Sequence, residues 1–261
     1  MNDILTQIRQ DLQSNADSQT RKNFQHFFKE QVKCYGVKVP IVGKIAKKYW
    51  NQVKILDKQT IFTLCEELYR SDYTEEAFVV SFWLPNYVDN LEPNDMATFK
   101  TWIELYINNW AKCDGFCNHT IGDLIQKYPQ ALSEVKSWAK SGNRWLKRAA
   151  AVSLIVPAKR GSFLQDAFEV CDVLLVDVDE MVQKGYGWLL KEESRQHQKE
   201  VFDYVIKNRA IMPRTALRYA IELMPKKLRI QAMKKDQQKS ALTKKRSNMR
   251  EGSNGTSNHI V

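Results

Sequence analysis

The stretch "GFCNHTIGDLIQKYPQALSEVKSWAKSGNRWLKRAAAVSLIVPA" (residues 115–158) shows most clearly how this chain is built. Apolar residues recur in it every three or four positions, which is the spacing of amphipathic helices. Helix-breaking residues interrupt the pattern twice, at Pro129 and at the Ser-Gly-Asn sequence 141–143. The stretch therefore predicts three consecutive helices joined by short turns.

The same rhythm extends over nearly the whole chain, and no segment shows the sustained alternation of a β-strand. Helices are expected over residues 2–13, 17–33, 40–53, 57–71, 72–88, 92–110, 115–129, 130–142, 143–158, 162–176, 179–195, 196–210 and 213–224. Helix pairs then recur roughly every 35 to 45 residues, the period of HEAT-like and armadillo-like arrays. We predict an all-α fold, a curved right-handed solenoid of HEAT-like antiparallel helix pairs over residues 1–235 with one concave face.

The composition argues against several classes of protein. The longest apolar runs, 77–84 and 149–156, are too short to span a bilayer. The N-terminal segment has the pattern of an amphipathic helix and not of a signal peptide. The five Cys residues form no regular framework, which favours reduced thiols and a cytoplasmic location. No Walker loop, dinucleotide fingerprint or G-x-S-x-G sequence is present. We therefore expect no cofactor and no membrane association.

The net charge of +10 is unevenly distributed. Ten Lys/Arg and only two acids follow residue 225, and we expect a basic, disordered tail over residues 236–261. Residues 21–54 contain nine Lys/Arg and one acid, Glu30, and residues 135–165 contain seven Lys/Arg and no acid. These two segments form a phosphate-binding surface if they share a face of the fold, and are ordinary solvated helix faces if they do not.

A cluster of reactive residue types occurs just before this second basic segment. Cys113, Cys117 and His119 have a C-x3-C-x-H spacing that could bind zinc, but a fourth ligand is missing nearby. Asp114 and Gly115 argue against a continuous helix at this point. No His pairs with a Cys in the signature of a thiol nucleophile. We therefore predict neither a metal site nor a covalent catalyst here.

Trp110 and Asp114 are followed by a strongly basic helix that carries Arg144, Lys147 and Arg148. Because Arg144 and Arg148 are four residues apart, they project from one face of that helix. A simpler interpretation of the acid is that Asp114 caps a helix beginning near residue 116.

Two glycines, Gly185 and Gly187, precede Trp188 in the middle of a predicted helix. Each costs roughly 1 kcal/mol there relative to Ala, which suggests that something approaches the helix closely. The alternative for both Trp188 and Trp110 is an ordinary place in the hydrophobic core.

Three motifs together resemble one known family. They are "NNWAKCDG" (108–115), "NRWLKRAAAVSLI" (143–155) and "VQKGYGWLLKEESR" (182–195), with "YGVKVP" (35–40) and "ALRYAIELMP" (216–225) as weaker matches. They are similar to the DNA alkylation repair family of HEAT-repeat DNA glycosylases, the AlkD-like enzymes. The similarity runs from about residue 20 to residue 230, and its most specific parts are W-x3-D, R-W-x-x-R and G-W-x-L-[KR]-E.

This resemblance implies that Trp110, Asp114, Arg148 and Trp188 line a concave DNA-binding cleft. The family often has an aromatic residue seven positions before the last Trp, where this chain has Met181.

A further aromatic residue of the family would be Phe27 or Phe28 here. Family members that lack the Asp are thought to bind DNA without catalysis, and this chain keeps it.

The resemblance further implies a monofunctional DNA glycosylase that hydrolyses the N-glycosidic bond of positively charged N3- or N7-alkylated purines, with the base in or near the stack. A fixed carboxylate, Asp114, would stabilise the oxocarbenium-like sugar and orient the attacking water. Trp110 and Trp188 would present their ring faces to the cationic nucleotide.

Arg148 would bind a phosphate near the lesion, assisted by Arg144 and Lys147. The implied partner is double-stranded DNA with alkylated bases, bound by a monomer in the cytoplasm at the nucleoid, with no metal and no small-molecule cofactor. Two other classes remain open: a non-catalytic protein that binds DNA structures, and a HEAT-like scaffold that binds another protein. DNA affinity that falls with rising salt would argue against the scaffold.

Overall fold

Helices form all the regular structure in residues 2–234, the part of the chain that the computed structural model describes, and no strand occurs among them. The α-helices are α1 (Asn2–Ser14), α2 (Ser18–Gln25), α3 (Val39–Val53), α4 (Lys58–Arg70), α5 (Thr74–Trp83), α6 (Met96–Tyr106), α7 (Trp110–Phe116), α8 (Gly122–Lys127), α9 (Leu132–Trp138), α10 (Arg144–Val152), α11 (Ile155–Lys159), α12 (Leu164–Leu174), α13 (Glu180–Glu193), α14 (Gln198–Asn208), α15 (Arg214–Ala220) and α16 (Lys226–Met233). Three short 3-10 helices, η1 (Leu84–Asn90), η2 (Pro93–Asp95) and η4 (Pro129–Ala131), and one π-helix, η3 (Cys117–Ile121), lie between them. The prediction of an all-α fold is confirmed. The predicted tail over 236–261 lies outside the described residues.

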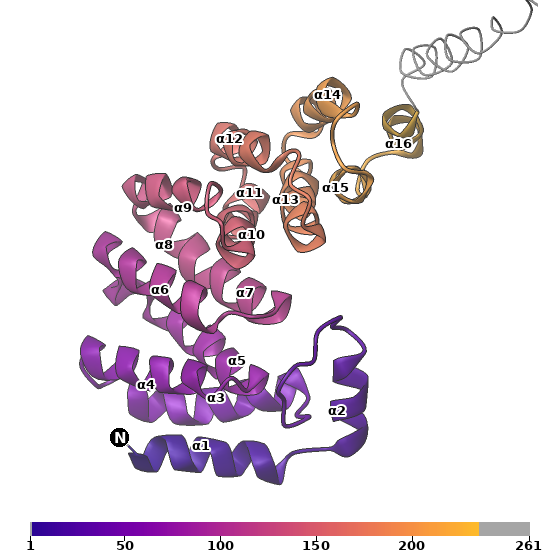
Figure 1. The fold of residues 1–261 in the computed structure, drawn as a ribbon. Coiled ribbons are helices and arrows are strands. Elements are labelled where there is room, and N and C mark those ends of the chain that lie inside the picture. The colour runs from indigo at the N-terminus through magenta and orange to yellow at the C-terminus, as the bar shows by residue number, and fades with distance from the viewer. Residues whose placement is uncertain (1, 235–261) are drawn as a thin grey trace, which may run out of the picture.

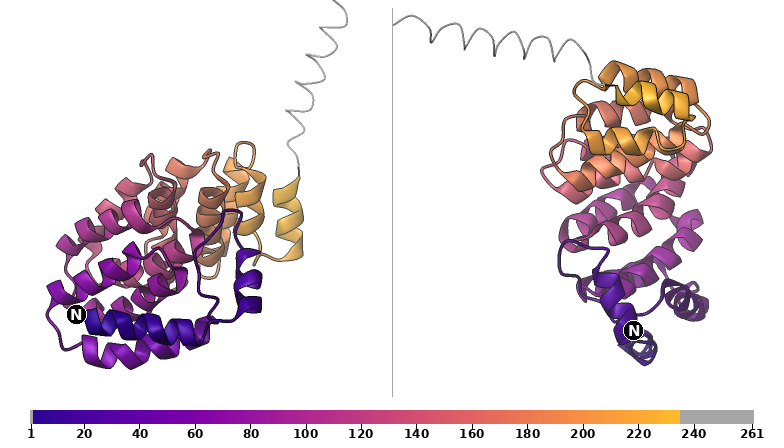
Figure 2. Two further views of the ribbon diagram at one scale, coloured as in Figure 1. Left: turned by 60° about the horizontal axis from the view of Figure 1, so that its bottom comes forward. Right: turned by 90° about the vertical axis from the view of Figure 1, so that its right-hand side faces the viewer.

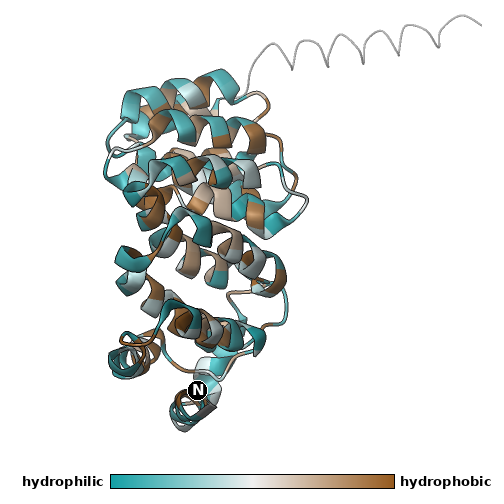
Figure 3. Ribbon diagram, turned by 90° about the vertical axis from the view of Figure 1, so that its left-hand side faces the viewer, coloured by the Kyte–Doolittle hydropathy of each residue, from teal (hydrophilic) through white to brown (hydrophobic). Residues whose placement is uncertain are grey.

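The helices stack in chain order into a curved array (Figure 1). One row of helices is continuous: α3, α5, α7, α10, α13 and α15 each pack against the next member. Figure 2 shows the same succession from two other sides, and Figure 3 shows that most helices carry both hydrophilic and hydrophobic residues. We call these six helices the inner row, because the cavity described below opens on four of them. Burial of one side of each helix explains the periodicity of the sequence.

Helix α2 stands apart from the stack, on its concave side (Figure 1). It begins at the Asp17 N-cap, whose side chain accepts a hydrogen bond from Thr20 N. It ends at Gln25, so the prediction of a helix through residue 33 is wrong. The Gln25 side chain instead bonds the backbone of the following segment, accepting from Val32 N and donating to Glu30 O. These bonds replace the backbone bonds of a longer helix.

The chain enters α3 through a turn at residues 35–38. Gly36 has φ +91°, and a Cβ on it would lie 2.5 Å from Asp17 O, so only glycine fits there. The buried Glu75 carboxylate of α5 accepts the backbone N–H groups of Tyr35, Gly36 and Val37. Because these bonds involve a charged acceptor, they fix the turn firmly on α5.

Helix α7, which carries the candidate site, is anchored by an aromatic cluster. Phe116 at its C-terminal end packs against Tyr69, Phe99 and Trp102, with ring centroids 5.3 to 6.2 Å apart. Phe116 and Phe99 are fully buried. Such ring contacts stabilise a helix in one position.

Candidate active site

Trp110 and Asp114 lie one turn apart on the same face of α7. Asn109 is the N-cap of this helix, and its side chain accepts a hydrogen bond from Lys112 N. The chain continues without a break through η3 into α8, so the prediction of a non-helical turn at Asp114 and Gly115 is wrong. The alternative in which Asp114 caps a helix beginning near residue 116 is wrong for the same reason.

Glycine is tolerated inside α7 because another helix lies against it. A Cβ on Gly115 would be 3.0 Å from Ser81 Oγ of α5. The close approach of α5 therefore accounts for a residue that the sequence presented as a helix breaker.

The side chains considered as zinc ligands do not converge. Cys113 and Cys117 are fully buried, and the Cys113 thiol lies 3.7 Å from Trp145 O. The His119 side chain is 62% exposed and lies beside Asp123. In residues 2–234 no three Asp, Glu, His or Cys side chains are grouped as they are around a metal ion.

Arg148 of α10 binds the Asp114 carboxylate in a bidentate ion pair. Its Nε donates to Oδ1 and its Nη2 donates to Oδ2, each over 2.8 Å, and its Nη1 donates to Met181 O of α13. Only 5% of Arg148 is exposed. Burial raises the pKa of the Asp114 carboxyl, and the Arg148 guanidinium acts in the opposite direction. The guanidinium thus offsets part of the cost of burying the carboxylate.

The two glycines of α13 allow close contacts, as predicted. A Cβ on Gly185 would lie 3.3 Å from Cγ of Arg148, and one on Gly187 would lie 2.8 Å from Ala216 O and from Tyr219 Cβ of α15. Gly185 therefore leaves room for the arginine that binds Asp114. Gly187 lets α15 approach α13.

Trp110 is fixed by the segment that follows α2. Its ring stacks on Phe28, with centroids 5.3 Å apart and planes inclined by 23°. Its indole N–H donates to Phe27 O over 3.3 Å. Phe28 is buried, whereas Phe27 is 71% exposed.

A cavity of about 540 Å³ collects these groups. It is lined by His26, Phe27, Phe28, Lys29, Glu30, Trp110, Asp114, Arg148, Met181, Lys184, Trp188 and Tyr219. The four residues carried over from the family, Trp110, Asp114, Arg148 and Trp188, thus come together from α7, α10 and α13. The Trp188 indole N–H donates to Glu192 Oε1 of the same helix over 3.2 Å.

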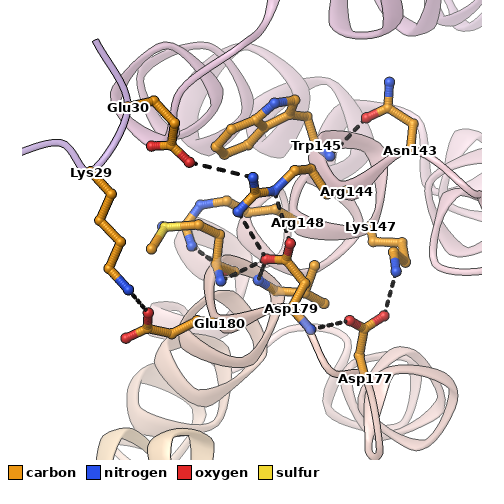
Figure 4. A network of polar contacts seen from close by, with 12 residues as sticks. Lys29, Glu30, Asn143, Arg144, Trp145, Lys147, Arg148, Asp177, Asp179 and Glu180 are labelled. Atoms are coloured by element: carbon orange, nitrogen blue, oxygen red, sulfur yellow. Dashed lines mark hydrogen bonds and ion pairs between the residues drawn. The ribbon is translucent and has the colours of Figure 1, made fainter. Parts of the chain in front are cut away.

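The two other predicted phosphate ligands are paired with acids beside this cavity (Figure 4). Arg144 Nε lies 2.9 Å from Asp179 Oδ2, and Arg144 Nη1 donates to Glu30 over 3.4 Å. Lys147 pairs with Asp177, and it does not line the cavity. The contact between Arg144 and Glu30 brings the two basic segments of the sequence together. Binding of phosphate by Arg144, Lys147 and Arg148 remains a prediction.

Several lining residues were not identified from the sequence. Lys184 lies one turn before Trp188 on α13, and that spacing could have revealed it. Lys29 and Glu30 directly follow Phe27 and Phe28. They were missed because a continuous helix was expected over residues 17–33. Tyr219 comes from α15, and no spacing rule connects it with the other motifs.

No helix in residues 2–234 has the length and apolar content needed to cross a membrane.

Comparison with known proteins identifies the family of this chain and shows which structures share its fold. A sequence profile described as "DNA alkylation repair enzyme" matches residues 8–224. No curated protein sequence matches the chain.

The solved structures similar to this one include the following two. A protein described as a "Predicted DNA alkylation repair enzyme from Enterococcus faecalis" superposes with a TM-score of 0.73 at 16% identity, over 81% of this chain and 98% of that one. At this identity the similarity shows a common fold. The Pseudomonas fluorescens alkylpurine DNA glycosylase AlkC, bound to DNA containing an abasic site analog, gives a TM-score of 0.46 at 15% identity, over 84% of this chain and 62% of that one. Because the profile spans most of the helices described above, the resemblance stated from the motifs is confirmed, and the chain belongs to the DNA alkylation repair enzyme family.

Proposed function

We propose that this protein is a DNA glycosylase that hydrolyses the N-glycosidic bond of positively charged N3- and N7-alkylated purines in duplex DNA. One observation carries the proposal: the Asp114 carboxylate lies in the same cavity as Trp110 and Trp188. A negative charge flanked by two aromatic side chains is suited to a cationic nucleotide. Membership of a DNA alkylation repair family supports the same chemistry.

An alkylated purine already carries positive charge, so its base leaves as a neutral molecule and requires no protonation. The group that needs stabilisation is the oxocarbenium-like deoxyribose that develops as the bond breaks. A fixed carboxylate provides this electrostatically, and it also orients the attacking water. Asp114 is our choice for both tasks.

Arg148 supports this role through orientation. Its two parallel hydrogen bonds hold the plane of the Asp114 carboxylate. Each carboxylate oxygen retains a further acceptor site for a water molecule or for the sugar. Preorganisation of this kind lowers the cost of reorganising the site during the reaction.

Lys184 and Arg148 line the cavity, and Arg144 pairs with Glu30, which also lines it. Together with Lys147 on α10, they are the candidates for contact with the DNA backbone. Their charges steer a duplex toward the cavity without reading its sequence.

The proposal is tested by release of free base from duplex DNA that contains 7-methylguanine or 3-methyladenine. The natural protein should release the base, and Asp114→Asn should lose about 10²- to 10³-fold in rate, the magnitude typical of a fixed electrostatic group. Binding of a duplex with a tetrahydrofuran abasic analog should be retained in the variant. Retained binding of this duplex shows that the variant is folded.

A protein that binds the duplex but releases no base, with or without Asp114→Asn, would be a non-catalytic DNA binder. Asp114 would then only hold Arg148 in place. No binding of duplex DNA at all would favour a protein-binding scaffold.

A further inference from the structure

Residues Phe27–Glu30, which we call the strap, cross the cavity from α2 to the far half of the array. Lys29 pairs with Glu180 at the start of α13, and Glu30 pairs with Arg144 at the start of α10 (Figure 4). These partners are separated by 151 and 114 residues in sequence. Phe27 and Phe28 of the same segment contact Trp110. The strap therefore closes one side of the cavity.

The two carboxylates on Arg144 differ in how firmly they are held. Asp179 is fixed in place, because it is also the N-cap of α13 and accepts hydrogen bonds from Met181 N and Val182 N. Glu30 belongs to the strap, its side chain is 50% exposed, and its contact with Arg144 is the longer one at 3.4 Å. Glu30 is therefore the partner that another anion can replace.

Arg144 is suited to hold a phosphate after that replacement. Its guanidinium lies over the Trp145 ring, 5.0 Å from the centroid, which keeps it in one orientation. Arginine forms two-point contacts with phosphate as it does with carboxylate. An anion that takes the place of Glu30 would lie at the rim of the cavity that contains Asp114.

We propose that the Glu30 carboxylate occupies, on Arg144, the position that a DNA phosphate takes when a duplex enters the cleft. This inference rests on the DNA binding assumed in the proposed function and on Arg144 as a phosphate ligand, but it does not require catalysis. Entry of DNA exchanges one anion for the other and detaches one end of the strap. Glu30 therefore competes with DNA for Arg144, and this competition lowers the affinity of the site for DNA.

The size of the effect follows from the exposure of the pair. Exposed ion pairs contribute about 0.2–1 kcal/mol, so removal of the Glu30 charge should tighten DNA binding by up to about fivefold. A gain from a general increase in positive charge must be separated from a gain that depends on Arg144. A double-mutant cycle makes that distinction.

The experiment titrates a fluorescently labelled undamaged duplex, at one fixed salt concentration, with the natural protein, Glu30→Gln, Arg144→Gln and the double variant. Glu169→Gln is the matched control, because its carboxylate pairs with Lys136 and does not line the cavity. We expect tighter binding, by about two- to fivefold, for Glu30→Gln alone. The same substitution should have no effect in the Arg144→Gln background, and the control should bind like the natural protein.

Unchanged affinity of Glu30→Gln would overturn the inference. So would an equal gain in the Arg144→Gln background, or an equal gain in the control, because either would indicate a general charge effect. If the natural protein binds the duplex but releases no alkylated base, only the proposed catalysis fails. The titrations with undamaged duplex then still decide whether Glu30 competes with DNA for Arg144. Absence of any DNA binding would overturn both.

Discussion

Arg148 Nε and Nη2 each lie 2.8 Å from one carboxylate oxygen of Asp114, so a buried guanidinium from α10 sets the orientation of the acid on α7. The two residues are 34 positions apart, and the ion pair ties together two neighbouring members of the inner row. The same contact thus contributes to the fold and to the candidate chemistry.

Arg148→Met should destabilise the protein by about 3–5 kcal/mol, because it leaves the Asp114 carboxylate buried without its partner. Urea unfolding monitored by circular dichroism measures this loss. Arg144→Met, one turn earlier on α10, removes a partly exposed arginine and should cost about 1 kcal/mol or less. Similar losses for the two variants would contradict the structural role of the buried pair.

Phe28→Leu should slow base release by roughly 10- to 100-fold, because it removes the ring that holds Trp110 and lets the indole move. Phe24→Leu is the matched control: Phe24 packs on Phe28 but does not touch the indole. Single-turnover rates and DNA affinities of both variants provide the measurement. An equal loss of rate in both variants would mean that the aromatic residues contribute only to stability, and Phe28→Tyr should restore the rate if stacking is what matters.

Gly187→Ala should destabilise the protein by about 1–3 kcal/mol, as overpacking of a well-filled interior does. The added methyl group would lie 2.8 Å from Ala216 O, a backbone atom that cannot move independently of α15. Gly142→Ala is the control, since a Cβ there meets nothing within 4 Å. Thermal unfolding of both variants tests the prediction, and a Gly187→Ala protein as stable as the control would disprove it.

Glu193→Gln should change the dependence of stability on pH. The Glu193 side chain is fully buried, its two oxygens accept no hydrogen bond from the described residues, and burial raises its pKa to about 7. Between about pH 4.5 and 7 the unfolded chain therefore loses this proton while the folded protein keeps it. Stability falls as pH rises through that window, by up to about 3 kcal/mol in total.

The glutamine variant carries no such proton, so the two proteins should be most alike near pH 4.5. Above pH 7 the variant should be the more stable one. Denaturant unfolding at pH 4.5, 6 and 8 measures the difference. Curves that stay parallel over this range would show that Glu193 is not held in its protonated form.

The sequence predicted the helical architecture well because each helix buries one side, and the ranges expected to begin at residues 17 and 57 start at the N-caps of α2 and α4. It failed where tertiary contacts override local preference. Helix α2 stops at Gln25 because Phe28 is buried against Trp110 and Gln25 bonds the next segment. Gly115 stays inside a helix because Ser81 of α5 lies against it.

The candidate site was predicted in part. Spacing placed Trp110 and Asp114 in one motif and Arg148 in another, and the structure brings both to one cavity. The ion pair between Asp114 and Arg148 was not predicted, because contacts between different helices leave no periodic signal. Glu30 was noted only as the single acid of a basic segment, and its contact with Arg144 required the three-dimensional arrangement.

The close contact of Gly187 with α15 has a mechanical consequence for the cavity. On that side, α13 and α15 meet backbone against backbone, so the wall formed by Trp188 and Tyr219 cannot yield without separating the two helices. On the other side lies the strap, whose ion pairs to α10 and α13 are partly exposed. The cavity therefore has one stiff wall and one compliant wall, and under the proposed function differences in shape among bound DNA strands are absorbed by the strap.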